Sequence, residues 1–191
     1  MVSRPQCAVF IAASLDGFIA RADGGLEWLS IVERAGEDYG YRDFFDGVDA
    51  LVMGRRTYDT VAGFDDWPYA GKRCVVLAHA PPAARHGEEF ASGAPGPLLE
   101  RLGAEGVRRV YVDGGAVIRQ FLAADLVDEL TLSVIPVLLG DGIPLFGGPR
   151  AGVSPPPPAP SPARELRLSS ARPFASGLVQ LRYQLEERRP P

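Results

Sequence analysis

The strongest constraint on the fold is a regular alternation between aliphatic runs and segments with helical spacing. Four runs rich in Val, Ile and Leu have the length and composition of buried strands, at residues 6–14, 49–54, 73–79 and 108–114. The intervening and following segments have the spacing of helices, at residues 27–48, 56–64, 97–106 and 116–127. Near-continuous apolar strands that alternate with helices predict an α/β fold, with a mainly parallel sheet covered by helices on both faces.

The pattern changes in the last third of the chain. Segment 128–140 is predicted to be a long strand, and no helix of ordinary length follows it. Residues 149–163 contain a run of prolines, which predicts a rigid, solvated surface loop. Segments 164–174 and 177–187 alternate with period two, which predicts an antiparallel C-terminal hairpin. The length of the chain and the absence of repeats indicate one domain over residues 1–191.

Composition and charge exclude several classes of protein. The net charge of −4 argues against a nucleic-acid partner bound by bulk electrostatics. The apolar runs are far shorter than the roughly 20 residues that span a bilayer, so we expect no membrane partner. Cys7 and Cys74 both lie in predicted buried strands, without a CxxC motif and with only 2 histidines in the chain. We therefore expect no metal site and two free thiols, typical of a reducing cytoplasm.

Two predicted strands, at 49–54 and 108–114, are each followed by glycine and then by a predicted helix. Free N–H groups and the positive end of the helix dipole favour an anion at a helix start, and glycine lets a ligand approach the backbone. Parallel strands end at the same edge of a sheet, so two such turns can hold the two ends of a dinucleotide. The candidate cofactor-binding residues are Gly54, Arg55, Arg56, Thr57, Gly114, Gly115 and Ala116.

The arginine pair in the first turn suggests which dinucleotide binds. A guanidinium offers a planar set of donors that matches phosphate oxygens. Adjacent helical residues face different ways, so one of Arg55 and Arg56 can bind a ribose phosphate while the other points elsewhere. An extra cation favours the 2′-phosphorylated cofactor, so we expect NADPH rather than NADH. The alternative is that the glycines only make tight turns and the arginines are solvated surface charges.

Two acids are candidate catalytic residues. Asp16 follows the first predicted strand, and Asp113 ends the strand at 108–114. If these strands are neighbours, we expect both carboxylates to face the crevice where a nicotinamide would lie. A carboxylic acid there can protonate a hydride acceptor such as an imine. The alternatives are a turn former in Leu-Asp-Gly for Asp16 and an N-cap of the following helix for Asp113.

Four motifs together resemble the dihydrofolate reductase superfamily, and most closely the reductase half of the bifunctional deaminase-reductase of riboflavin biosynthesis. They are SLDGFIA, VMGRRTY, YVDGGAVIRQFL and DELTLSVIPVLLGDGIPLF. The resemblance covers most of the chain and implies a three-layer fold with a mixed, mostly parallel sheet, NADPH as hydride donor, and a homodimer. It places the two glycine turns at the cofactor phosphates and both acids at the substrate end. The riboflavin family usually has a glutamate at the position of Asp113.

The expected activity is therefore NADPH-dependent reduction of a small heterocycle or ribosyl imine. The leading substrate is a pyrimidine-ribosyl phosphate such as 5-amino-6-(5-phosphoribosylamino)uracil. Dihydrofolate is one alternative. In dihydrofolate reductases an acidic side chain points at the pterin, and Glu27 is the nearest acidic residue to that position in this chain. A non-catalytic dimer that binds NADP is the other.

Overall fold

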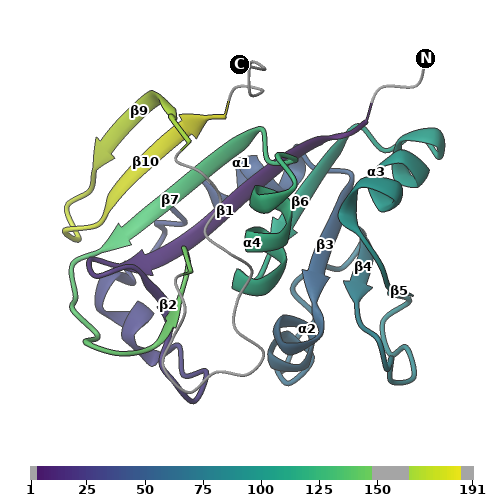
Figure 1. Ribbon diagram of the computed structural model, residues 1–191. Helices are drawn as coiled ribbons and strands as arrows, with labels where there is room; N and C mark the ends of the chain where they lie inside the picture. The colour runs from purple at the N-terminus through teal and green to yellow at the C-terminus, as the bar shows by residue number, and fades with distance from the viewer. Residues whose placement is uncertain (1–3, 148–163, 186–191) are drawn as a thin grey trace.

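The computed structural model describes residues 4–147 and 164–185. Its main sheet contains β1 (Gln6–Ser14), β3 (Ala50–Gly54), β4 (Arg73–Leu77), β5 (Glu89–Ala91), β6 (Arg109–Asp113), β7 (Glu129–Ile135), β9 (Arg167–Pro173) and β10 (Val179–Gln184). The strands lie in the order β5-β4-β3-β6-β1-β7-β10-β9 (Figure 1). The first six in this order are parallel, and β10 and β9 complete the sheet as antiparallel strands.

Helices cover both faces of the sheet. The helical elements are the 3₁₀ helix η1 (Glu27–Val32) and the α-helices α1 (Tyr41–Asp46), α2 (Arg55–Val61), α3 (Pro95–Ala104) and α4 (Gly115–Ala123). On one face, α3 and α4 contribute to a core that includes Leu99 and Phe121. On the other face, α1 and α2 pack over a second core and η1 over a third. A separate two-stranded sheet pairs β2 (Phe18–Ala20) with β8 (Ile143–Pro144).

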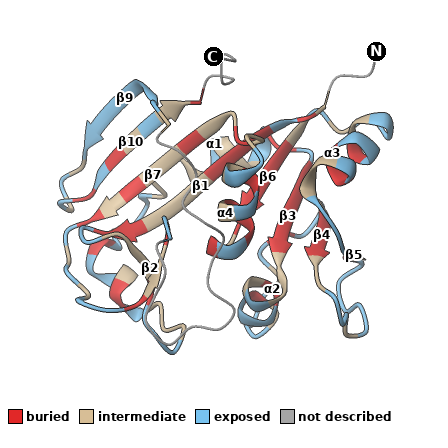
Figure 2. Cartoon of the chain, in the orientation of Figure 1, coloured by how far each residue is buried: buried red, intermediate tan, exposed pale blue. Residues whose placement is uncertain are grey.

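The central strands are buried on both faces, which explains their near-continuous apolar sequences. In β3, Val52 belongs to the core beneath α3 and α4, whereas Leu51 and Met53 belong to the core on the opposite face. All three are fully buried, and Figure 2 shows the same burial along β4 and β6. Every residue of the edge strand β9 is exposed. The parallel centre of the sheet therefore supplies a rigid frame for the loops at its carboxyl edge.

The structure confirms the predicted fold class. All four early strands form within two residues of their predicted ends, and the C-terminal hairpin is antiparallel as expected. Helix α3 stops before Gly106, which adopts φ of +91°. The short strands β2, β5 and β8 were not predicted from the sequence, because each has at most three residues. No helix in the described part of the chain has the length and apolarity to cross a membrane.

The expectation of a continuous helix over 27–48 is wrong. Residues 33–40 separate η1 from α1, and Gly36, Tyr39 and Gly40 in this segment have positive φ. A right-handed helix cannot continue through such residues. The predicted proline loop at 149–163 lies outside the described residues.

Candidate active site

The two glycine turns lie side by side at the carboxyl edge of the sheet. Strands β3 and β6 are parallel neighbours, with Met53 opposite Asp113. A Cβ on Gly54 would lie 3.2 Å from Cγ2 of Val117, and the Thr57 side chain packs against the backbone of Gly114. The structure therefore brings the starts of α2 and α4 into contact at one rim, where ligands of open α/β sheets bind.

Among the residues that the structure describes, no side chain caps either helix start. Neither α2 nor α4 has a side-chain cap, and neither has an acidic residue in its first turn. Gly114 adopts φ of +87°, a conformation that non-glycine residues rarely adopt. Open N–H groups, glycine backbone and first turns without acidic residues fit a bound phosphate. The residues of this rim thus fit the pyrophosphate of a dinucleotide.

The two arginines of the first turn have different surroundings. Nε of Arg55 donates to both carboxylate oxygens of Asp59, at 2.7 and 2.8 Å, and its Nη1 donates to the Ala80 carbonyl oxygen at 3.0 Å. Arg56 is exposed, and its guanidinium has no hydrogen bond or ion pair among the residues that the structure describes. The side chains therefore face different ways, as expected for adjacent helical residues.

Arg55 also lines a small polar pocket of about 190 Å³ beside α2. Arg85, in the segment between β4 and β5, lines the same pocket. Sequence reasoning missed Arg85, because a lone arginine in a loop carries no periodic signal. The pocket brings Arg85 to α2, where the Asp59 carboxylate lines it together with the two arginines.

Asp113 is buried at the junction between β6 and α4, with 9% exposure. Its Oδ2 accepts a hydrogen bond from the Tyr69 hydroxyl at 3.1 Å, and its Oδ1 accepts one from the Gly114 N–H at 2.7 Å. Burial raises the pKa of Asp113 above its ordinary value, because the charged form loses its hydration. The N-cap alternative does not hold, since the carboxylate bonds the adjacent N–H and leaves α4 uncapped.

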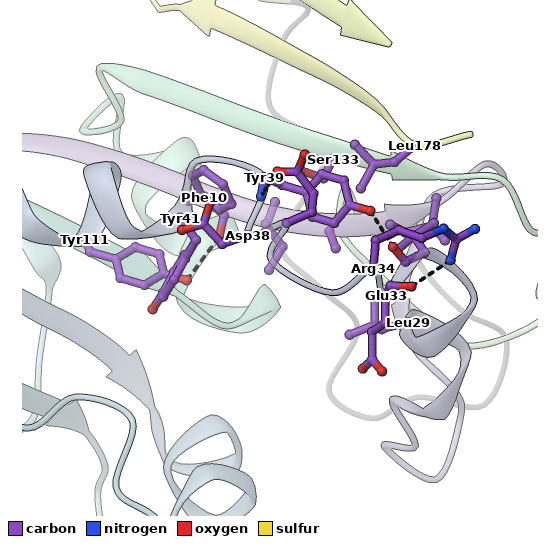
Figure 3. A pocket seen from close by; sticks show the side chains of 15 residues that line it. Phe10, Leu29, Glu33, Arg34, Asp38, Tyr39, Tyr41, Tyr111, Ser133 and Leu178 are labelled. Atoms are coloured by element: carbon purple, nitrogen blue, oxygen red, sulfur yellow. Dashed lines mark hydrogen bonds between the residues drawn. The ribbon is translucent and has the colours of Figure 1, made fainter. Parts of the chain in front are cut away.

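A cavity of about 430 Å³ opens on the face of the sheet that holds the Tyr111 side chain, and Asp113 is not among the residues that line it. Figure 3 shows its walls, which come from β1, β6, β7, η1, the segment before α1, Tyr41 of α1 and Leu178 before β10. Tyr111, two residues before Asp113 on the same face of β6, forms one wall and donates a hydrogen bond to the Phe10 carbonyl oxygen at 3.0 Å. The cavity size is typical of a small-molecule site.

The sequence did not indicate this cavity. Its residues come from five helices and strands and from two connecting segments. Its aromatic members Tyr39 and Tyr41 fall in the segment that was expected to be helical. Only tertiary contacts bring them to the middle of β1. An unusual density of tyrosine and phenylalanine in residues 39–45 is the one signal that was available.

Asp16 has a different environment from Asp113. It is exposed, and its carboxylate accepts hydrogen bonds from the Ser14 hydroxyl at 2.6 Å and from the N–H groups of Leu139 and Gly140 at 3.1 and 2.7 Å. The bond from Ser14 and the two backbone bonds lower the pKa of Asp16. These contacts match the turn-forming alternative, with a further attachment to the loop after β7.

The structure does not bring the two acids together. Strands β1 and β6 are parallel neighbours as expected, with Ala8 opposite Tyr111. This register puts Asp113 level with Phe10 of β1. Strand β1 continues for four more residues, about 13 Å, before it ends at Ser14, and Asp16 follows that end. A catalytic role for Asp16 therefore has no geometric support from Asp113 and stays a prediction.

Glu27 begins η1, the helix whose residues Leu29 and Val32 line the cavity. Its exposed carboxylate pairs with Arg21, whose hydrogen bond lowers the pKa of Glu27, and Glu27 is not among the cavity-lining residues. The structure therefore gives no support to Glu27 as an acid that addresses a pterin.

Comparison with solved structures defines the class to which this fold belongs. The chain matches a dihydrofolate reductase from Enterococcus faecalis complexed with NADP(H), with a TM-score of 0.63 over 95% of this chain and 97% of that chain. Sequence identity is 17%, so this likeness shows the fold alone. The protein has a dihydrofolate reductase-like fold.

More similar proteins identify the family. The model of the RibD C-terminal domain matches residues 88–179. A putative riboflavin biosynthesis protein from Shewanella sp. PV-4 is 34% identical, with a TM-score of 0.84 over 95% of this chain and 99% of that chain. The uncharacterized protein YwjB of Bacillus subtilis is 38% identical over 144 residues, 74% of this chain and 82% of that protein. The chain belongs to the family of the RibD C-terminal domain.

The chain corresponds to only part of one longer relative. The riboflavin biosynthesis protein RibD of Corynebacterium ammoniagenes is 32% identical over 163 residues, and the matched part spans 47% of that protein.

Proposed function

We propose that the protein is an NADPH-dependent reductase that transfers a hydride to a C=N or C=O carbon of a small heterocyclic substrate. One observation carries this proposal: two uncapped helix starts, one with an arginine pair, meet at the sheet edge beside a buried carboxyl group. Membership of the RibD C-terminal family supports it. A protein of similar fold from Thermotoga maritima, 16% identical, is named as a deaminase and 5-amino-6-(5-phosphoribosylamino)uracil reductase.

The cofactor end of the proposed site is the rim formed by the two turns. NADPH, when bound, supplies the hydride. The N–H groups at the starts of α2 and α4 would bind its pyrophosphate, with Gly114 and Gly115 allowing close approach. The exposed guanidinium of Arg56 would donate to a phosphate oxygen of the cofactor. Arg55 would donate to the cofactor through the N–H groups that do not bond Asp59 or Ala80.

The substrate end is the cavity on the Asp113 side of β6. An imine accepts a hydride more readily when its nitrogen is protonated, and Asp113 is the group that can hold this proton. Its burial favours the protonated carboxyl, and the hydrogen bonds from Tyr69 and Gly114 fix its orientation. A pyrimidine with a ribosyl phosphate is the first substrate to test, because the matched relatives carry riboflavin-biosynthesis names.

The test is a titration of NADPH and NADH against the wild type and the Arg55→Ala/Arg56→Ala variant, followed by cofactor oxidation with candidate heterocycles. We expect the wild type to bind NADPH at least about tenfold more tightly than NADH, because a guanidinium–phosphate pair contributes well over 1 kcal/mol. The double variant should lose this preference. Arg108→Ala is the matched control. Arg108 is exposed and precedes β6 at the end opposite to the glycine turn, so this variant should retain the preference for NADPH.

Two results would contradict the proposal in different ways. Equally weak binding of both cofactors to every form would remove the cofactor assignment. NADPH binding without oxidation by any heterocycle, unchanged by Asp113→Asn, would instead indicate the non-catalytic NADP-binding dimer.

A further inference from the structure

Arg119 lies in the second turn of α4, and its side chain folds back toward the start of that helix. A Cβ added to Gly115 would lie 3.0 Å from Nη1 of Arg119, and a Cβ added to Gly147 would lie 2.9 Å from its Cδ. Long side chains on a helix point toward its N-terminus in this way. The two glycines therefore leave the space that the Arg119 side chain occupies beside the α4 start.

Two backbone carbonyl oxygens hold the guanidinium of Arg119. Nη1 donates to the Pro144 carbonyl oxygen at 2.6 Å and to that of Leu145 at 3.5 Å. In the part of the chain that the structure describes, Nε and Nη2 make no hydrogen bond and no carboxylate forms an ion pair with Arg119. Carbonyl oxygens carry no net charge, so this half-buried arginine keeps a full positive charge and donors that can still bind an anion.

The carbonyl oxygens that hold Arg119 belong to a segment with its own supports. Pro144 ends β8, which pairs with β2 in the small antiparallel sheet. The next residue, Leu145, is fully buried, and its N–H donates to the Gly17 carbonyl oxygen at 3.0 Å. The guanidinium is therefore positioned by folded backbone before any ligand binds, which reduces the entropy cost of using it to bind one.

Arg119 and Arg55 lie at opposite ends of the proposed cofactor rim. Arg55 donates to Ala80, which follows β4, on one side of the ends of β3 and β6. Arg119 bonds β8, whose partner β2 follows β1, on the other side of those ends (Figure 1). The turn at Gly114 and Gly115 lies between them. The α4 end of the rim therefore has a cation of its own, separate from the arginine pair of α2.

From these contacts we propose that Arg119 is a cofactor-binding residue that donates its free N–H groups to the pyrophosphate of the dinucleotide. The positive end of α4 and an arginine without a carboxylate partner attract the same anion. The inference rests on the proposed function in one respect, that this rim binds the cofactor. Because NADPH and NADH share the pyrophosphate, Arg119 contributes to the binding of both and does not choose between them.

The test measures the dissociation constants of NADPH and NADH for the wild type, Arg119→Gln and Arg119→Lys by nicotinamide fluorescence. A glutamine amide can still donate to a carbonyl oxygen but carries no charge, whereas lysine retains the charge. Arg119→Gln should weaken both cofactors about tenfold and leave the ratio of their dissociation constants unchanged. Arg119→Lys should bind both within about threefold of the wild type. Arg108→Gln, at an exposed position away from the rim, is the matched control and should change neither.

Two further measurements distinguish a binding role from a structural one. The difference between the wild type and Arg119→Gln should shrink as salt rises from about 0.01 M to about 1 M, because salt screens the interaction of a cation with phosphate. Inorganic pyrophosphate, which has no nicotinamide or adenosine, should displace NADPH from Arg119→Gln at about tenfold higher concentration than from the wild type. Hydrogen exchange at the Leu145 amide should stay as slow in Arg119→Gln as in the wild type.

The outcomes separate this inference from the proposed function. Equal binding of both cofactors to the wild type and Arg119→Gln would overturn the role of Arg119 and leave the cofactor assignment in place. A loss of binding that lysine does not repair, with fast exchange at Leu145, would overturn it as well and show that Arg119 only supports β8. A changed ratio of the two dissociation constants would place Arg119 at the 2′-phosphate instead. Failure of the wild type to bind either cofactor would remove the proposed function, and the role of Arg119 with it.

Discussion

The hydroxyl oxygen of Thr57 occupies the space into which a side chain at position 114 would project. A Cβ on Gly114 would lie 2.1 Å from Oγ1 of Thr57 and 3.2 Å from its Cβ. Thr57 belongs to the first turn of α2 and Gly114 precedes α4, so this contact joins the two helix starts. The geometry of the proposed cofactor site therefore depends on one glycine that has no room for a methyl group.

Gly114→Ala should destabilise the fold for two separable reasons. The φ of +87° strains any L side chain by about 1–2 kcal/mol, and the overlap with Thr57 adds roughly 1–3 kcal/mol. Urea denaturation should show the combined loss in unfolding free energy. Gly17→Ala is the matched control, because Gly17 has the same φ of +87° with no atom within 4 Å of its added Cβ.

A second-site change distinguishes the two contributions. Thr57→Ala in the Gly114→Ala background should recover part of the overlap energy and none of the φ strain. If Gly17→Ala proved as destabilising as Gly114→Ala, the contact between the helix starts would not be the cause.

Asp113→Asn should lower kcat about 10²- to 10⁴-fold while the dissociation constant of NADPH stays within about twofold. The amide has the shape of the carboxyl group but cannot transfer a proton. Steady-state kinetics and a separate NADPH titration measure the two quantities. Asp66→Asn, at an exposed position, is the control and should change neither.

The same variant tests the protonation state of Asp113. Its pKa is raised in the folded protein by burial, so its contribution to stability is present at low pH and is lost as pH rises through that pKa. The unfolding free energy of the wild type, relative to Asp113→Asn, should therefore fall with increasing pH above about 4. A relative stability that rises with pH over this range would show that the buried group is a carboxylate instead.

Glu88 should make the fold sensitive to acid. Burial alone would raise the pKa of Glu88, but hydrogen bonds from the Tyr58 hydroxyl and the N–H groups of Arg85 and His86 outweigh it and lower the pKa to about 2. A depressed pKa stabilises the fold above the unfolded value of 4.5 and loses this effect as pH falls toward 2.

Glu88→Gln should therefore cost roughly 2–3 kcal/mol of unfolding free energy at pH 7 and progressively less between pH 4.5 and pH 2. Chemical denaturation across this range measures the difference. The exposed Glu100→Gln should show no such pH dependence. A constant difference between wild type and Glu88→Gln at all pH values would contradict the assignment.

Asp16→Asn should loosen the loop that follows β7. The Asp16 carboxylate accepts the Leu139 and Gly140 N–H groups, and an amide has only one oxygen to replace the two that bond them. Amide hydrogen exchange at Leu139 and Gly140 should speed up, while exchange in the β1 ladder stays slow. Unchanged exchange at both amides, together with a large loss of kcat, would favour the catalytic role for Asp16.

Local sequence pattern was sufficient for much of this fold. The aliphatic runs that became β1, β3, β4 and β6 are buried on both faces, so period and composition alone mark them as central parallel strands. The glycines at 54 and 114 mark turns for a similarly local reason, the need for close backbone approach or positive φ. The homodimer, the cytoplasmic location and the single domain stay predictions.

Strand register and long-range packing decided the rest. The sequence by itself determined that two glycine turns would lie at one sheet edge, because parallel strands end on the same side. It could not determine that Asp16 lies past the end of β1, four strand residues beyond the level of Asp113, since the β1–β6 register depends on contacts between distant segments. Nor could it reveal the cavity, whose Phe10, Tyr41 and Ser133 share no local period and meet only through the tertiary structure.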